Sequence, residues 1–146
     1  MTAKEYLQRY QTAYREAQDT ELRMAQLRLK YSAPAAIEYN DMPKAHSSEH
    51  DLSDYIVKMD ELTDHLISKY TRCMAIEADI LERLDMMEKQ NDRLDRIQIQ
   101  KEREVLRMRY IDDLDWDEIA DKLHYTYRHV TRLHGTALLH FPMPTE

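Results

Sequence analysis

A short stretch near the C-terminal end of the chain combines arginine, threonine and tyrosine at spacings that suit DNA recognition. Arg128 and Arg132 are four residues apart, so a helix would present both on one side. Thr126, Tyr127 and Thr131 are interleaved with them. A guanidinium group can bind guanine through two parallel hydrogen bonds, and threonine or tyrosine can contact a phosphate or a thymine methyl. We therefore predict that these five residues contact double-stranded DNA.

The charge of the whole chain opposes this prediction, but its distribution supports it. The formal net charge is −7, whereas DNA phosphates need a basic surface. No aspartate or glutamate lies between His124 and Thr145, a stretch that holds both arginines and three histidines. A local basic face can bind DNA on an acidic chain, with modest affinity unless the protein oligomerises.

Three predicted helices between Lys101 and His140 must position these side chains. The first has an apolar face that includes Val105 and Tyr110 and ends near Ile111. The second begins after Asp115, which forms a capping box with Glu118, and the third begins after Thr126. The inward faces comprise Trp116, Ile119, Ala120 and Leu123 on the second helix and Val130, Leu133 and Ala137, extended by Leu138 and Phe141, on the third.

This pattern predicts a helix-turn-helix. Ala120 is small enough to let two helices cross closely, and the connection at His124 and Tyr125 is short. The residues that face outward on the first turns of the third helix are those that enter the major groove in such modules. The alternative is a three-helix packing unit that touches no DNA.

The stretch from Lys101 to His140 resembles region 4 of bacterial sigma factors. The resemblance is carried by Glu102–Leu106, Arg109–Ile111, Trp116–Ala120, Thr126–Val130 and Ala137–Leu138. It implies recognition of a promoter element, with RNA polymerase as a candidate partner. The other sigma regions are not recognisable, so the chain is not expected to open a promoter. With its helical front part, the chain resembles small sigma-region-four-like proteins of phages and prophages, such as late-gene activators of the ArpU and RinA type.

Three departures from the sigma pattern stand out. His124 and Tyr125 occupy a turn where sigma factors usually carry a glycine or another small residue. The third helix contains Gly135, which costs about 1 kcal/mol relative to alanine in a helix and suggests a bend after His134. The outward residues differ from the usual sigma set, so we expect a different target sequence.

The front two thirds of the chain read as two long helices. One runs from about Ala3 to Tyr31, and the other begins at Ser48 or Asp51. The first carries its apolar stripe at Tyr6, Tyr10, Ala13, Ala17, Met24, Leu27 and Tyr31, with Thr20 between. The second carries Leu52, Tyr55, Met59, Leu62, Leu66, Tyr70, Cys73, Ile76, Ile80, Leu84 and Met87. The second stripe outruns the first helix, which predicts a homo-oligomer.

The predicted fold is therefore all-α, a long helical hairpin or coiled-coil arm followed by a three-helix module. Residues 1–100 form the arm and oligomerisation region, with an irregular loop at about 32–50, and residues 101–146 form the DNA-binding module. A linker or helix break is expected between Asn91 and Gln100, where the sequence is polar and only weakly amphipathic.

Several classes of protein are disfavoured. The chain has no glycine-rich phosphate loop, serine elbow or paired-histidine metal motif, so we predict neither an enzyme nor a cofactor. His46 and His50, near Glu49 and Asp51, lack a persuasive third partner, so no metal is predicted. No apolar run is long enough for a membrane helix or a signal peptide, which favours the cytoplasm.

The predicted function is sequence-specific regulation of transcription, more specifically activation of phage late genes. One alternative is a phage DNA-packaging subunit of the small-terminase kind, which also joins a helix-turn-helix to an oligomerising helical region. A ring of eight or more subunits in solution would favour packaging, and a dimer or tetramer would favour regulation. A second alternative is a helical assembly protein that binds no DNA at any salt concentration.

Overall fold

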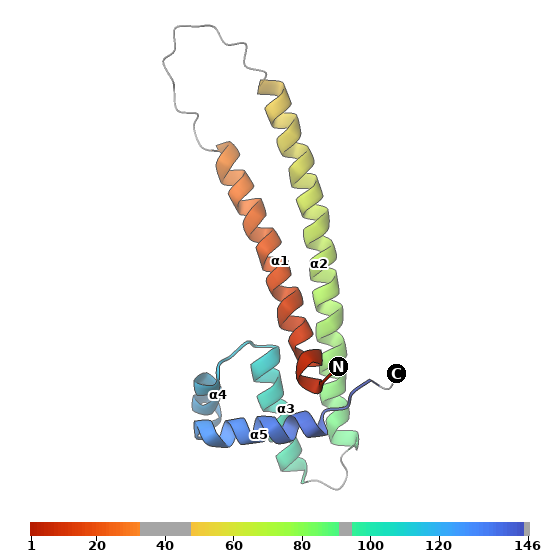
Figure 1. Cartoon of the computed structure of the whole chain (residues 1–146), viewed down its shortest axis with the longest axis vertical. Helices are drawn as coiled ribbons and strands as arrows, with labels where there is room; N and C mark the ends of the chain where they lie inside the picture. Colours follow the sequence, from red (N-terminus) through yellow and green to blue (C-terminus); the bar gives the residue numbers. More distant parts are fainter. Residues whose placement is uncertain (33–47, 91–94, 145–146) are drawn as a thin grey trace.

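The computed structural model describes residues 1–32, 48–90 and 95–144, and the regular secondary structure in these ranges is all α-helix. Its helices are α1 (Ala3–Ser32), α2 (Ser48–Gln90), α3 (Arg96–Tyr110), α4 (Trp116–Leu123) and α5 (Tyr127–His140). Helices α1 and α2 run side by side as a long antiparallel arm, and α3, α4 and α5 gather at its base (Figure 1). The predicted fold class is confirmed. None of the described helices is both long and apolar enough to cross a membrane.

Helix α1 turns its predicted stripe toward α2. Thr20 is buried within it because its hydroxyl donates to the carbonyl of Glu16 and accepts from Lys69 Nζ, so the one polar step is satisfied. Leu7, which the stripe does not include, is completely buried near the base of the arm. The buried α1 residues are Tyr6, Leu7, Ala13, Ala17, Thr20 and Met24.

The stripe of α2 is buried only in its second half. Cys73, Ile76, Ile80, Leu84 and Met87 are buried, and the residues from Tyr55 to Tyr70 in the stripe are half-buried. Leu52 is 59% exposed, so its predicted place in a buried seam is wrong. The gradient has a simple cause: along the distal arm α1 alone covers α2, and one helix covers only a narrow line of another.

At the base of the arm the end of the α2 stripe is covered by the same chain. Leu106 and Tyr110 of α3 and Ala137 and Phe141 of the α5 end share one core with Ile80 and its neighbours on α2. The apolar side chains at the end of α2, which the sequence analysis assigned to an interface with a second subunit, are therefore buried within one chain. The predicted homo-oligomer loses this argument and must rest on other residues.

Helix α3 begins earlier than the sequence predicts. Helix α2 ends at Gln90, consistent with a helix break from Asn91, but Asp95 caps α3 and accepts a hydrogen bond from the backbone N–H of Ile97 (3.1 Å). Ile99 is buried, so the prediction of a linker up to Gln100 is wrong from residue 95 onward. The alternation of Ile97 and Ile99 with polar residues hid this first turn of the helix.

Helix α5 runs from Tyr127 to His140 without a break, so Gly135 does not end the helix after His134. Gly135 is exposed in it, and a methyl group added there would meet no atom within 4 Å. We predict that Gly135→Ala raises the free energy of unfolding by about 0.5–1 kcal/mol, because alanine loses less backbone entropy on folding. Urea denaturation of the two proteins would measure this, and an unchanged midpoint would count against the reason given.

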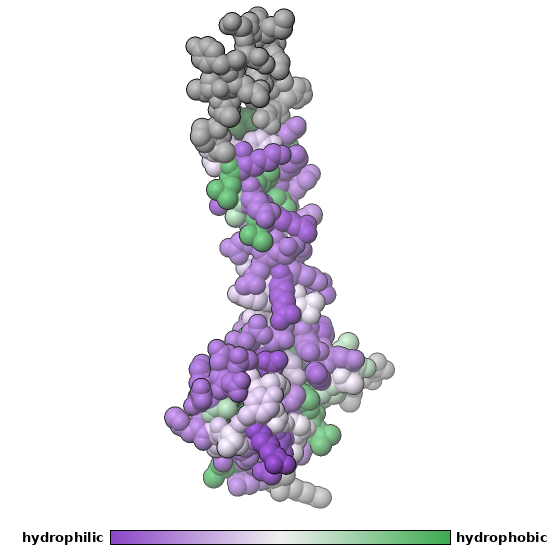
Figure 2. Space-filling model, turned by 60° about the vertical axis from the view of Figure 1, so that its left-hand side comes forward, coloured by the Kyte–Doolittle hydropathy of each residue, from purple (hydrophilic) through white to green (hydrophobic). Residues whose placement is uncertain are grey.

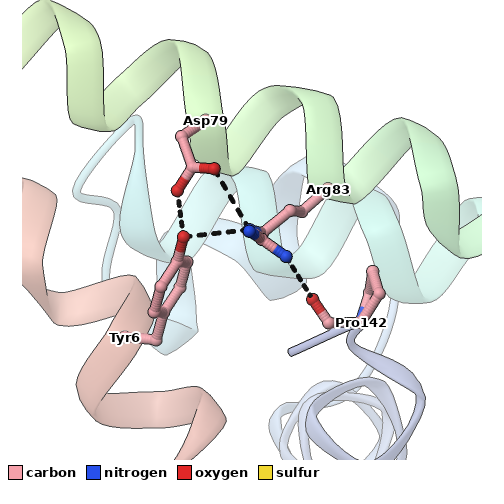
Figure 3. A network of polar contacts seen from close by, with 4 residues as sticks. All are labelled: Tyr6, Asp79, Arg83 and Pro142. Atoms are coloured by element: carbon pink, nitrogen blue, oxygen red, sulfur yellow. Dashed lines mark hydrogen bonds and ion pairs between the residues drawn. The ribbon is translucent and has the colours of Figure 1, made fainter. Parts of the chain in front are cut away.

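A polar network ties the arm to the end of the module (Figure 3). The Tyr6 hydroxyl donates to Asp79, and Arg83 Nε lies 2.9 Å from the Tyr6 oxygen and 3.2 Å from Asp79 Oδ1. Arg83 Nη1 also donates to the Pro142 carbonyl (3.3 Å). The network therefore joins α1, α2 and the segment after α5.

Two further contacts fix α3 in place. Gln11 of α1 donates to the carbonyl of Arg109 (2.9 Å). The Glu102 carboxylate is buried on α3 and is held by Gln98 Nε2 (3.0 Å) and His140 Nδ1 (2.7 Å). Because a buried carboxylate is costly without partners, the bond with His140 holds the end of α5 on α3.

Candidate nucleic-acid interface

Helices α4 and α5 form the helix-turn-helix, and α3 supports both. Val105 of α3 packs with Ile119 and Ala120 of α4 and with Val130 and Leu133 of α5 in a small core of their own. Both hydrogen bonds of the capping box predicted at the start of α4 are present in the structure. Asp115 Oδ1 accepts from the Glu118 N–H, and Glu118 Oε2 accepts from the Asp115 N–H, each at 2.9 Å.

The turn between α4 and α5 explains why glycine is common at this point. His124 adopts the left-handed conformation (φ 55°, ψ 42°), which costs a residue with a side chain about 1–2 kcal/mol. The N–H of Tyr125 donates to the Ala120 carbonyl (2.9 Å) and closes the end of α4. Thr126 then caps α5, with its hydroxyl oxygen 3.2 Å from the His129 nitrogen.

Four of the five predicted DNA-contacting residues line one open pocket with a volume of about 580 Å³. These are Thr126, Arg128, Thr131 and Arg132, and His129 lies among them. Tyr127 is 52% exposed but is not part of the lining. The structure thus brings Arg128 and Arg132 to one exposed face of α5, as their spacing predicts.

The two threonines offer different chemistry. The Thr126 hydroxyl accepts the capping bond, so its own proton is available to a phosphate oxygen. The Thr131 hydroxyl donates to the Arg128 carbonyl (3.1 Å), which leaves its methyl group and its oxygen lone pairs for a ligand. Thr126 is therefore suited to a phosphate contact, and Thr131 to a thymine methyl or a base amino group.

A chain of contacts extends this surface beyond α5. Arg132 Nη2 lies 3.3 Å from His129 Nδ1, and the His129 ring meets the Tyr125 ring edge-on at 4.7 Å. Lys101 Nζ of α3 lies over the Tyr125 ring, 5.6 Å from its centroid. Sequence reasoning missed Lys101 because α3 brings it here from far along the chain.

The charge of the two helices differs sharply. The exposed acids of the module lie on or before α4, at Glu104, Asp112, Asp113, Asp115, Asp117, Glu118 and Asp121. The first turn of α5 has no acidic residue. The positive end of the helix dipole and the two arginines make this end of α5 attractive to anions.

Comparison with known families decides what kind of module this is. Residues 100–140 match the family described as Sigma-70, region 4. This segment is a sigma-70 region 4 domain. The match covers less than a third of the 146 residues, and no curated protein or solved structure matches the chain. Domains of this family bind DNA and RNA polymerase and are regulatory rather than enzymatic.

The region 4 domain has a partly buried histidine behind the recognition face. The Tyr110 hydroxyl lies 2.9 Å from Nε2 of His134, and the Trp116 ring meets the imidazole edge-on. Burial, with the nearby charges of Lys4 and Arg109, lowers the pKa of His134 from 6.5 to about 4. His134 is therefore neutral in the folded domain at pH 7.

The low pKa of His134 predicts that acid destabilises the region 4 domain. As pH falls from about 7 toward 4, the unfolded chain takes up a proton that the folded chain refuses, so stability is lost over this range. Between pH 7 and 5 the loss should be about 1 kcal/mol, because solvent partly screens the half-exposed ring. In His134→Gln, which keeps a partner for Tyr110, this part of the pH dependence should vanish. Urea melts at both pH values would show it, and equal slopes in the two proteins would contradict it.

No group of three metal-ligating residues occurs in the described parts of the chain. The region 4 domain holds His124, His129, His134 and His140, but none of these histidines lies in a group of three residues that could bind one metal ion. The side chains of His46, Glu49, His50 and Asp51 lie outside the described residues.

Proposed function

We propose that this protein is a sequence-specific DNA-binding regulator of transcription that reads DNA with the first turns of α5. Arg128 and Arg132 contact bases, and Thr126, Tyr127 and Thr131 contact phosphates or thymine methyl groups. The observation that supports this is the coincidence of three features on one surface. The concave lining, the acid-free first turn of α5 and the predicted contact residues all fall together within the region 4 domain.

The finer biological role follows from the resemblance to phage proteins. We propose that the protein activates phage late genes, acts in the cytoplasm, contacts RNA polymerase through the region 4 domain, and works as a homo-oligomer. Residues 1–100 serve as its arm, and residues 101–146 as its DNA-binding module. Oligomerisation would compensate for the small basic face on an acidic chain, since two modules double the number of phosphate contacts.

Selection from random duplex DNA with the full-length protein tests the DNA-binding function. We expect one motif to be enriched at a fixed salt concentration. The logarithm of the binding constant for this motif should fall linearly with the logarithm of the salt concentration. A scrambled motif serves as the control for non-specific binding. If no motif is enriched and no duplex binds even at low salt, the proposed function is wrong and a helical assembly role replaces it.

A further inference from the structure

The two arginines of the open pocket on α5 differ in how they are held. Both side chains are exposed, and the region 4 domain is mainly hydrophilic on the face shown in Figure 2. On such a surface, hydrogen bonds rather than apolar packing orient an exposed side chain. Arg132 Nη2 lies 3.3 Å from Nδ1 of His129, which is one helical turn earlier. The Arg128 side chain has no hydrogen bond or ion pair with any of the described residues.

The chemistry of the two groups fixes the direction of the bond between Arg132 and His129. A guanidinium group has five N–H donors and no acceptor, so Arg132 donates and His129 Nδ1 accepts. The bond therefore requires the neutral imidazole, with its proton on Nε2. It uses one donor of Arg132, so the guanidinium keeps an edge of two N–H groups that can bind guanine. His129 can thus hold Arg132 without preventing it from reading a base.

The His129 ring is itself held by its neighbours. It meets the Tyr125 ring edge-on, with 4.7 Å between the centroids and 82° between the planes, and this contact fixes the plane of the imidazole. Tyr125 packs against the small core that contains Val130, and the Lys101 ammonium lies over its ring. The core of the domain therefore orients Tyr125, Tyr125 orients His129, and His129 orients Arg132.

We propose that His129 is a positioning residue that makes Arg132 selective for one base pair of the target DNA. This inference rests on the proposed function and names a residue that sets its specificity. Two parallel hydrogen bonds to guanine need one geometry of the guanidinium, so an arginine held in place discriminates better than one that can turn to a phosphate. An arginine already in place also loses less rotamer entropy when it binds. Arg128, which lacks such a partner, is the internal comparison.

Selections from random duplex DNA with variants of the full-length protein test this role. Arg132→Ala and Arg128→Ala should each relax the motif at a different base pair, which identifies the pair that each arginine reads. His129→Ala should lower the preference at the Arg132 pair by about tenfold, as expected for residues in one hydrogen-bond network, and should leave the Arg128 pair unchanged. His129→Asn should restore most of this preference, because the asparagine amide oxygen takes the place of Nδ1 as the acceptor.

A double-mutant cycle separates positioning from a direct contact of His129 with DNA. Fluorescence anisotropy measures binding of wild type, His129→Ala, Arg132→Ala and the double variant to the selected motif and to the motif changed at the Arg132 pair. If His129 acts through Arg132, His129→Ala should change nothing further once Arg132 is alanine. The four melting temperatures should be close to each other, because neither residue belongs to the small core that contains Val130.

Three results would overturn the role of His129 while the proposed function stands. The first is a motif that is unaltered in His129→Ala. The second is a loss that is equal at all base pairs, which indicates a phosphate contact by His129 itself. The third is a loss of the same size with and without the Arg132 side chain, because the histidine then acts independently of the arginine. A wild type that selects no motif would overturn the proposed function, and this inference with it.

Discussion

The double variant Arg128→Ala, Arg132→Ala should bind its selected DNA between about 30-fold and 20,000-fold more weakly than wild type, since each bidentate contact with guanine contributes about 1–3 kcal/mol. Both side chains lie on the exposed face of α5, and neither belongs to the core formed around Val130 and Leu133. The melting temperature and helix content should therefore remain close to those of wild type. Fluorescence anisotropy at fixed salt measures the affinity.

The pattern of loss identifies the contact. Loss of affinity for the selected motif alone indicates base reading, whereas equal loss on all duplexes with a shallower salt slope indicates phosphate contacts. Arg15→Ala is the matched control, because Arg15 is exposed on α1 and distant from α5 in the chain. Wild-type affinity in the double variant would show that α5 does not read DNA.

The largest loss of stability is expected from Leu84→Ala. Leu84 is 2% exposed in the core that joins α2 to α3 and to the end of α5. Removing a buried leucine side chain costs about 2–5 kcal/mol, from lost apolar burial and from the cavity that remains. The same core holds the arm and the region 4 domain, so both should lose stability together.

Two probes can follow this loss in separate parts of the molecule. Trp116, the single tryptophan of the chain, reports on α4, whereas circular dichroism is dominated by the long helices α1 and α2. In urea, both signals should move to the same lower midpoint in Leu84→Ala. Leu139→Ala is the control, because Leu139 is 83% exposed and should shift neither signal. A tryptophan midpoint that stays at its wild-type value would show that the region 4 domain folds without the arm.

Local signals in the sequence were sufficient for the helix-turn-helix. Asp115 with Glu118 and Thr126 mark helix starts through bonds between residues three apart, so spacing alone identifies them. The inward faces of α4 and α5 follow from helical periodicity, and the same geometry placed Arg128 and Arg132 together. The sequence also marked His124 as a departure from the small residue usual in this turn, and the structure places His124 in the left-handed conformation.

Contacts between distant parts of the chain were not predictable in this way. The cover that α3 and α5 give to Ile80 and Leu84 depends on tertiary packing, so the stripe on α2 seemed to need a second subunit. Lys101 and Tyr125 meet only because α3 lies against the turn before α5.

The network of Tyr6, Asp79, Arg83 and Pro142 has a consequence for how the protein is made. These four residues come from both ends and the middle of the chain, and the Tyr6 ring also meets Phe141. Residues near the N-terminus leave the ribosome long before Phe141 and Pro142 are synthesised. The base of the arm therefore cannot close until Phe141 and Pro142 have left the ribosome, and its apolar residues stay exposed in the nascent chain until then. Slow synthesis of the segment after α5 would lengthen the interval in which these apolar residues are open to aggregation.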